Sequence, residues 1–179
     1  MNPTQNPSAL RSKKIITETL ITLLKDYPLS EITVKHILLE SGISRKTFYR
    51  NFSSKEDVLS SYIDSILFEY KDKIIDDSNI TFTESFDIIF NFCAVNKELL
   101  IILKNNNLLY LPLMKLNTLL PTLHKDIDNR SYLIYFNIGG IWNIIVNWIN
   151  NDMLDSADKI KRNLIDYLSD INNISLCDL

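Results

Sequence analysis

The sequence predicts an all-α protein with about nine helices, arranged as a three-helix head with a helix-turn-helix followed by a C-terminal helical bundle. Three observations predict this class. The 179 residues include only three Gly and five Pro, so few residues interrupt a helix. Apolar residues recur at helical spacing in most segments, and strand-like alternation persists nowhere. A chain of this length suits one core with a small appended head.

The N-terminal residues predict a tail and a first helix. Residues 1–8 hold two Pro and several polar residues, which is typical of a flexible tail. From about residue 9 to 27 the apolar residues fall on one helix face, at Ile16, Leu20, Leu23 and Leu24. The proline at position 28 ends this helix.

Two short helices follow, joined by a tight turn. The first covers about 33–41 and begins at Thr33, whose side chain can cap it. Gly42 ends it, because glycine tolerates a positive φ. Ser44 then caps a helix that reaches about residue 52.

A long helix connects the head to the rest of the chain. Ser53 and Glu56 have the spacing of a capping box, and the helix runs from there to about residue 75. Beyond a polar connection we expect five more helices, with Pro112 and Pro121 bending or ending the third of them. Their approximate spans are 82–95, 97–105, 107–124, 130–150 and 156–173.

We expect three units along the chain. They are the tail over 1–8, a DNA-binding helix-turn-helix domain over 9–60, and a helical dimerisation and effector-binding domain over 61–179. The charge divides at the same place. Residues 1–60 carry nine Lys and Arg against six Asp and Glu, a balance of +3, and the remainder carries ten against sixteen, a balance of −6. The basic excess therefore lies in the expected DNA-binding head, although such an asymmetry also arises by chance.

The third helix offers a surface suited to DNA. A short helix, a tight turn and a second short helix form the arrangement that places a helix in the major groove. The expected exposed side of the second of these helices is basic and hydrogen-bonding, without an acid: Arg45, Lys46, Thr47, Tyr49, Arg50 and Asn51. Such a surface can meet phosphates and base edges without like-charge repulsion. The alternative, a solvated basic face on a helical bundle, fits any one of these residues but not the whole run.

Roles follow from position along this helix. We expect Arg45 and Lys46, in its first turn, to reach base edges. Thr47 suits a thymine methyl or a phosphate, and Tyr49 and Asn51 suit the backbone.

Further contacts to the duplex are expected from neighbouring helix starts. Thr33 opens a helix whose N-terminal amides suit a phosphate, and Lys35 adds charge there. Lys55 lies in the first turn of the fourth helix, where we expect it to face the DNA backbone.

This segment resembles the N-terminal domain of the TetR family. The resemblance rests on a Gly-Ile-Ser turn, a Thr-Phe-Tyr run, then a Phe and a Lys, here Gly42, Ile43, Ser44, Thr47, Phe48, Tyr49, Phe52 and Lys55. It covers about residues 9–60 and is faint beyond. The chain departs from the pattern at Leu38 and Leu39, where alanine is frequent, and at Arg50 and Asn51, where the family varies.

The resemblance implies a TetR-like fold and a sequence-specific transcriptional regulator that binds double-stranded DNA. It implies a homodimer on a pseudo-palindromic operator, acting as a repressor and released by a small apolar ligand. The alternative is a TetR-like activator or adaptor that a protein partner controls through the C-terminal domain.

The uncharged segment 131–150 supports a dimer on its own account. It is apolar on nearly every side, so we expect it to be buried all round, with a second subunit as the simplest cover. The residues expected at the interface are Phe136, Gly140, Trp142, Val146, Leu164, Tyr167, Leu168 and Ile171. The alternative is an ordinary core helix of a monomer.

A ligand pocket is a weaker expectation. Its candidate lining is Phe82, Phe86, Phe90, Leu103, Tyr110, Met114 and Trp142. Aromatic residues at these spacings are more often plain core.

Other classes of protein lack support in the sequence. No catalytic constellation, metal-spaced His/Cys set or phosphate-binding loop is present, so we expect no enzyme, no metal and no cofactor. The segment 131–151 is long enough to span a bilayer, but its five asparagines argue against a membrane protein. Cys93 is expected to be a small core residue. No signal peptide is visible, so a cytoplasmic location is expected.

Overall fold

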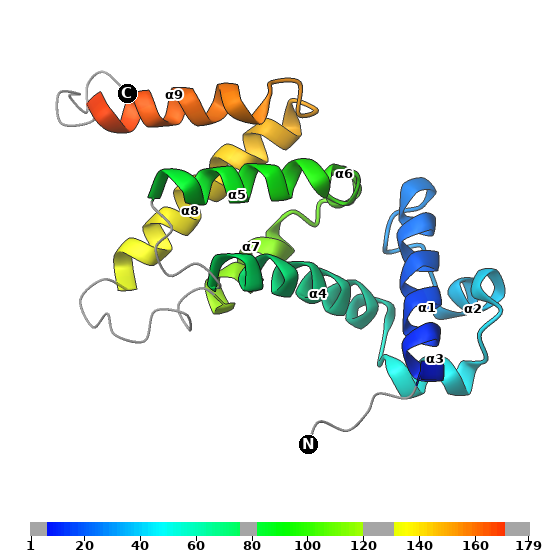
Figure 1. Cartoon of the computed structure of the whole chain (residues 1–179). Helices are drawn as coiled ribbons and strands as arrows, with labels where there is room; N and C mark the ends of the chain where they lie inside the picture. Colours follow the sequence, from blue (N-terminus) through cyan, green and yellow to red (C-terminus); the bar gives the residue numbers. More distant parts are fainter. Residues whose placement is uncertain (1–6, 76–81, 120–130, 171–179) are drawn as a thin grey trace.

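The computed structural model describes residues 7–75, 82–119 and 131–170 and confirms the all-α class (Figure 1). These residues form helices without a strand: α1 Pro7–Asp26, α2 Val34–Ser41, α3 Arg45–Asn51, α4 Lys55–Ile75, α5 Phe82–Val95, α6 Lys97–Asn105, α7 Tyr110–Leu119, α8 Ser131–Asn150 and α9 Ala157–Asp170.

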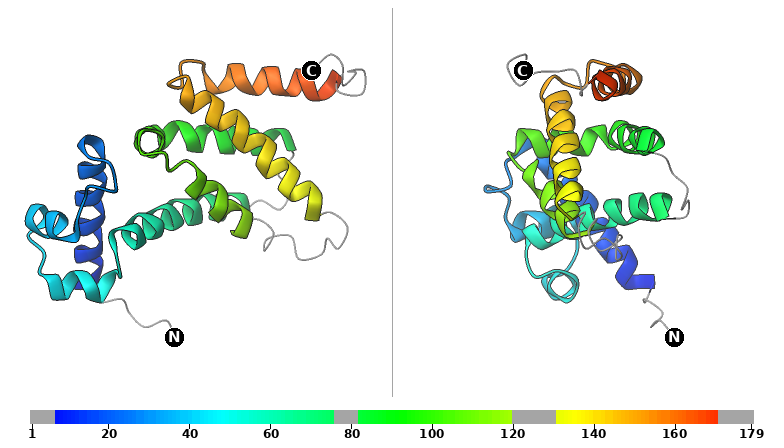
Figure 2. Two further views of the ribbon diagram at one scale, coloured as in Figure 1. Left: turned by 180° about the vertical axis from the view of Figure 1, so that it is seen from behind. Right: turned by 90° about the vertical axis from the view of Figure 1, so that its left-hand side faces the viewer.

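The helices form a head and a body joined by α4. Helices α1 to α3 lie together at one end of the molecule, and α8 and α9 lie on the side away from α2 and α3 (Figures 1 and 2). Two ion pairs link helices of the body. Lys115 of α7 lies 2.6 Å from Asp64 of α4, and Lys161 of α9 pairs with Asp87 of α5. Helix α3 lies at the end of the molecule away from α8 and α9 (Figure 1).

The buried side chains form two clusters that do not divide at residue 60. The first cluster joins α1, α2 and α3 with the N-terminal half of α4, and it also includes Leu99, Ile102 and Leu103 of α6. The second cluster lies in the body and is built around Phe86, Phe90, Trp142, Trp148 and Ile149. The core of the head therefore includes residues of α6, a helix that comes after α4 and α5 in the chain.

The first helix begins earlier than the sequence indicated. It starts at Pro7, so Ser8, expected in the tail, is helical, and its carbonyl accepts a hydrogen bond from the hydroxyl of Ser12 at 2.9 Å. Proline suits a first helical position, because its missing N–H is not needed there and its φ is already helical. The rest of the expected tail, residues 1–6, lies outside the described residues.

The seventh helix begins three residues later than expected, at Tyr110. The intervening residues instead terminate α6. Asn107 has a φ of 58°, and the amide N–H groups of Asn107 and Leu108 reach back to the carbonyls of Lys104 and Leu103. This is the Schellman arrangement, in which asparagine can replace glycine. Proline at position 112 lies in the first turn of α7, so it does not break that helix. The expected residues 120–124, residue 121 among them, lie outside the described part.

Within one chain, helix α8 is buried along one side only, so the cover that a second subunit was expected to provide stays a prediction. Ile138, Trp142, Ile145 and Ile149 lie on its buried side, and Trp148 is also buried, with its indole N–H donating to the carbonyl of Asp155 at 2.9 Å. The asparagines at positions 143, 147 and 150 lie on the exposed side. Apolar residues outnumber the asparagines in this segment, so the polar face was not expected from the sequence. The asparagines recur every three to four residues and therefore lie on one side of the helix. The helices of the described ranges each lack the combination of length and hydropathy that a membrane-spanning segment needs.

Cys93 is the core residue that the sequence indicated. It lies in the second cluster and is 3% exposed. Burial raises the pKa of its thiol to about 12, because an apolar surrounding disfavours the thiolate.

Candidate nucleic-acid interface

The helix-turn-helix is built by two caps and one left-handed residue, all three as expected. The hydroxyl of Thr33 accepts from the amide N–H of His36 at 3.1 Å and opens α2. Gly42 has a φ of 65°, and its N–H donates to the carbonyl of Leu38. Ser44 then opens α3 by accepting from the amide of Thr47 at 3.2 Å. These local bonds fix the turn between the two helices.

The buried side of α3 is aromatic. Phe48 and Phe52 are almost fully buried in the first cluster, with ring centroids 6.2 Å apart. Ile37 of α2 is buried beside them, and Ile43 of the turn packs against the same cluster. Because both phenylalanines point inward, the remaining faces of this short helix must point outward.

The outward face of α3 carries the cations that the sequence placed there. Arg45, Lys46, Tyr49 and Arg50 are all exposed. The guanidinium of Arg45 lies over the ring of Tyr49, 5.5 Å from its centroid, which supports both side chains. α3 has no acidic residue, so this face can approach a polyanion without repulsion from its own helix.

Two of the expected contact residues are half-buried and bonded within the helix. The hydroxyl of Ser44 donates to that of Thr47 at 3.0 Å, so Thr47 takes part in the cap. The side-chain amide of Asn51 donates to the carbonyl of Thr47 at 2.7 Å. Their first role is to shape α3.

Lys55 was expected to face outward toward the DNA backbone, but its side chain points into the head. Its ammonium donates to the carbonyls of Leu29 and Ile32, at 2.6 and 2.5 Å, and more weakly to that of Ser30 at 3.3 Å. Its side chain is only 17% exposed. Lysine in the first turn of α4 thereby ties this helix to the segment between α1 and α2. No pattern of residues near Lys55 indicates these bonds, because the three carbonyls lie more than twenty residues away in the chain.

The capping box of α4 is displaced by one residue from the expected position. The cap is Ser54, whose hydroxyl accepts from the amide of Asp57 at 3.1 Å. The carboxylate of Asp57 reaches back to the amide of Ser53 at 2.7 Å and to its hydroxyl at 3.0 Å. The bond from this backbone amide is the main cause that lowers the pKa of Asp57 below its usual value.

Two further expected contacts lie at the start of α2. Thr33 and Lys35 are exposed around the first turn of α2. In α1, Lys13 is exposed and its ammonium lies 5.9 Å from the centroid of the Phe52 ring. The structure thus gathers cations on α1, α2 and α3 of one head.

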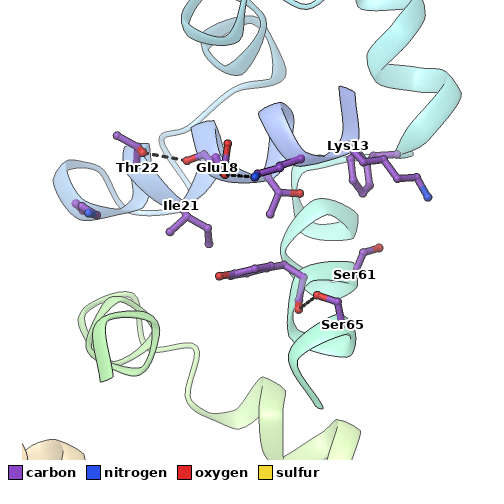
Figure 3. A pocket seen from close by; sticks show the side chains of 11 residues that line it. Lys13, Glu18, Ile21, Thr22, Ser61 and Ser65 are labelled. Carbon is purple, nitrogen blue, oxygen red and sulfur yellow. Dashed lines mark hydrogen bonds and ion pairs between the residues drawn. The ribbon is translucent and has the colours of Figure 1, made fainter. Parts of the chain in front are cut away.

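A cleft of about 570 Å³ separates α1 from α4 (Figure 3). Lys13, Lys14 and Lys25 line it from α1, and Tyr62 lines it from α4. The exposed ammonium of Lys14 pairs with Glu18 at 3.8 Å. The cleft lies beside the first cluster, in which α1 and α4 pack together.

The residues expected at a dimer interface divide into three groups. Phe136, Gly140 and Tyr167 are exposed, and a Cβ built on Gly140 would meet no atom within 4 Å. Trp142 is 6% exposed and belongs to the core of its own chain. Three are half-buried against that same core, namely Val146, Leu164 and Leu168. Ile171 lies outside the described residues.

The residues expected to line a ligand pocket are not brought together. Phe86, Phe90 and Trp142 pack in the second cluster, whereas Leu103 packs in the first. Tyr110 and Met114 are 54% and 60% exposed. Nothing is described of the side chain of Phe82. No cluster of three or more His, Cys, Asp or Glu side chains suited to a metal occurs in the described ranges.

Comparison with known proteins identifies the head. A family model described as bacterial regulatory proteins of the tetR family matches residues 16–62. Over 64 residues the chain is 41% identical to the HTH-type transcriptional regulator EthR of Mycobacterium tuberculosis, and the protein of that name from Mycobacterium bovis gives the same match. This stretch covers 36% of the present chain and 30% of the relative.

Two solved structures share the whole fold. A TetR transcriptional regulator from Streptococcus agalactiae superposes with a TM-score of 0.63 at 18% identity, over 87% of this chain and 92% of that one. The fatty acid degradation regulator FadR from Bacillus halodurans gives a TM-score of 0.62 at 18% identity, over 93% and 96% of the two chains. At this identity the likeness concerns the fold alone.

Proposed function

We propose that this chain is a member of the tetR family of bacterial regulatory proteins and that it is a sequence-specific DNA-binding repressor that acts as a homodimer. The single observation that carries this proposal is the exposed, acid-free face of α3, with Arg45, Lys46, Tyr49 and Arg50. Arginine and lysine bind phosphates and the acceptor edge of guanine, and a helix of this size fits the major groove. The relative EthR, which is named a transcriptional regulator, matches over the same head.

The proposed roles follow from the geometry of α3. Arg45 and Lys46 stand in its first turn, where a recognition helix reaches base edges, and Arg50 follows one turn later. Thr33 and Lys35, at the start of α2, suit the phosphate backbone, and so does the hydroxyl of Tyr49. Asn51 and Thr47 support the helix. The bonded ammonium of Lys55 supports the head and is not assigned to DNA.

A homodimer is proposed from the surface of α8. Its N-terminal half exposes Tyr132 and Phe136 by 85% and 75%, which is unusual for large aromatic side chains. Gly140 leaves open space one turn further along. Burying this strip against the same strip of a second copy, together with Tyr167 of α9, would satisfy both surfaces.

Repression follows from occupancy. Two heads that bind successive half-sites on one face of a duplex cover about two helical turns, so binding within a promoter blocks access to it. Release by a small apolar ligand has no comparable support, because Phe86, Phe90 and Trp142 fill the space expected for it with their own rings.

Selection from a random duplex library at low salt tests the proposal without knowledge of the operator. The protein should enrich an inverted repeat whose half-site centres lie about 10 base pairs apart or slightly more. Lys46→Ala should lose this enrichment. The matched control, Lys71→Ala on α4, removes a cation that lies over the ring of Phe68 and should keep it. Absence of any enriched sequence with the folded wild-type protein would contradict the proposal.

A further inference from the structure

Helix α6 connects the body to the head, although the sequence places it among the body helices. Leu99, Ile102 and Leu103 belong to the same buried cluster as the residues of α1 to α3. A polar link lies beside this apolar contact, since Lys25 of α1 pairs with Glu98 at 2.5 Å. That pair is exposed and contributes little by itself.

The side chain of Asn106, directly after α6, adds a directional link to this apolar contact. Its Oδ1 accepts from the backbone N–H of Leu29, between α1 and α2, at 2.9 Å. Its Nδ2 donates to the carbonyl of Leu24 in α1 at 3.3 Å and to that of Ile102 at 2.9 Å. One amide thus binds two points of the head and one of α6. Only a side chain with a donor and an acceptor can make all three bonds.

The backbone holds this amide in place. The amide N–H of Asn106 caps α6 by donating to the carbonyl of Ile102, and the left-handed residue Asn107 ends the helix immediately after it. The side chain therefore leaves a rigid helix end and not a mobile loop.

The other side of α6 is bound to the end of α8. Lys104 donates to the carboxylate of Asp152 at 2.8 Å and to the carbonyl of Asn150 at 3.2 Å. Lys97 donates to the carbonyl of Asp152, also at 3.2 Å. Helix α6 is consequently anchored to α8, the helix proposed to form the dimer, and to the head at the same time.

The head needs such an anchor because α4 alone would leave it free to tilt. Helix α4 has 21 residues and is therefore a lever of about 30 Å at a rise of about 1.5 Å per residue. A tilt of about 6° would move the head by about 3 Å, close to the rise of about one base pair. Helices α1 and α4 pack together in the first cluster, and a cleft opens between them beside that contact (Figure 3).

We propose that Asn106 is a positioning residue, which fixes the angle of the head to the body and thereby the half-site spacing that the protein accepts. It does so without touching DNA, by holding α1 and the segment after it against α6. This inference rests on the proposed function, DNA binding by a homodimer. Asn106, a residue of the body, would thereby help to determine which operators the protein binds.

The experiment measures the affinity of the protein for a series of duplexes that carry the selected half-sites with the spacer shortened or lengthened by one and two base pairs, and for one half-site alone. Asn106→Ala removes all three side-chain bonds. Asn105→Ala is the matched control, since Asn105 is exposed at the end of α6 and its side chain makes no hydrogen bond with another described residue.

The wild-type protein and Asn105→Ala should prefer one spacing by about 10-fold or more over its neighbours, because a misplaced head loses contacts. Asn106→Ala should accept the neighbouring spacings to within about 3-fold while its affinity for a single half-site stays the same. An Asn106→Ala protein that keeps the wild-type spacing profile would overturn the inference.

A second variant serves if Asn106→Ala does not fold. Asn106→Asp keeps the size and the acceptor for the N–H of Leu29, but it sets a carboxylate beside the carbonyl of Leu24. It should broaden the spacing profile in the same direction, and an unchanged profile would again overturn the inference. A folded wild-type protein that binds no duplex would instead refute the proposed function.

Discussion

The ammonium of Lys55, in the first turn of α4, lies 2.5 Å from the carbonyl oxygen of Ile32, at the end of the segment between α1 and α2. Together with its bond to the carbonyl of Leu29, this contact fastens the start of α4 to the head. A lysine that resembles a phosphate contact in the sequence is therefore a structural residue in the fold. Stability measurements can separate the two roles.

Replacing Lys55 by methionine should lower the free energy of unfolding by about 2 kcal/mol, because hydrogen bonds from a charged donor are lost and the carbonyls they satisfied are left partly buried. Urea denaturation followed by circular dichroism measures this. The matched control is Lys35→Met on the exposed start of α2, which should leave stability unchanged within about 0.5 kcal/mol. Equal stability of the two variants would contradict the role assigned to Lys55.

The capping carboxylate of Asp57 should make stability depend on pH in the acid range. Its pKa in the folded protein lies below the ordinary value of 3.8, chiefly because the backbone N–H of Ser53 stabilises the carboxylate. Its contribution is therefore complete above pH 3.8 and disappears as the pH falls through the lowered pKa. Asp57→Asn should be less stable than the wild type at neutral pH, and the difference should close as the medium is acidified. A difference that stays constant down to the acid limit of folding would refute this.

The exposed aromatic side chain of Phe136 should control the oligomeric state. A charge at its position would be desolvated in the proposed interface, so Phe136→Arg should weaken self-association by about 30-fold or more. Sedimentation velocity over a range of concentrations measures this. Val95→Arg, at another exposed apolar position, should sediment as the wild type does. A wild-type protein that stays monomeric at micromolar concentration would remove the dimer from the account.

The thiol of Cys93 should be inert in the folded protein. With its pKa raised to about 12 by burial, only about one molecule in ten thousand carries the thiolate at pH 8. In a Cys177→Ser background, labelling with a chromogenic disulfide should be slow in buffer and fast in urea. Fast labelling of the native protein would show that the second cluster is open to solvent.

The features that depend on neighbouring residues could be predicted from the sequence. The caps at Thr33 and Ser44 and the left-handed Gly42 are local, because each bond spans at most four residues. The inward side of α3 followed from helical periodicity. The family comparison confirms the identity of this head, over residues 16–62.

Contacts between distant segments could not be predicted from the sequence. Asn106 meets partners 77 and 82 residues away, and nothing in its own neighbourhood specifies them. The run of three asparagines at 105–107 could have indicated a left-handed helix end and thus the later start of α7. Tyr110 and Met114 were expected to line a ligand pocket inside the body, but both are exposed. Their exposure depends on how α7 packs on α4, which is again a contact between distant segments.

The central claim is that the cationic face of α3 binds DNA, and fluorescence anisotropy of a labelled duplex with the selected inverted repeat tests it most directly. Titrations between 50 and 200 mM salt should show that Arg45→Ala and Arg50→Ala each lower affinity by about 10-fold, with a shallower salt dependence wherever the lost cation met a phosphate. Affinity and salt dependence that match the wild type in both folded variants would contradict the account.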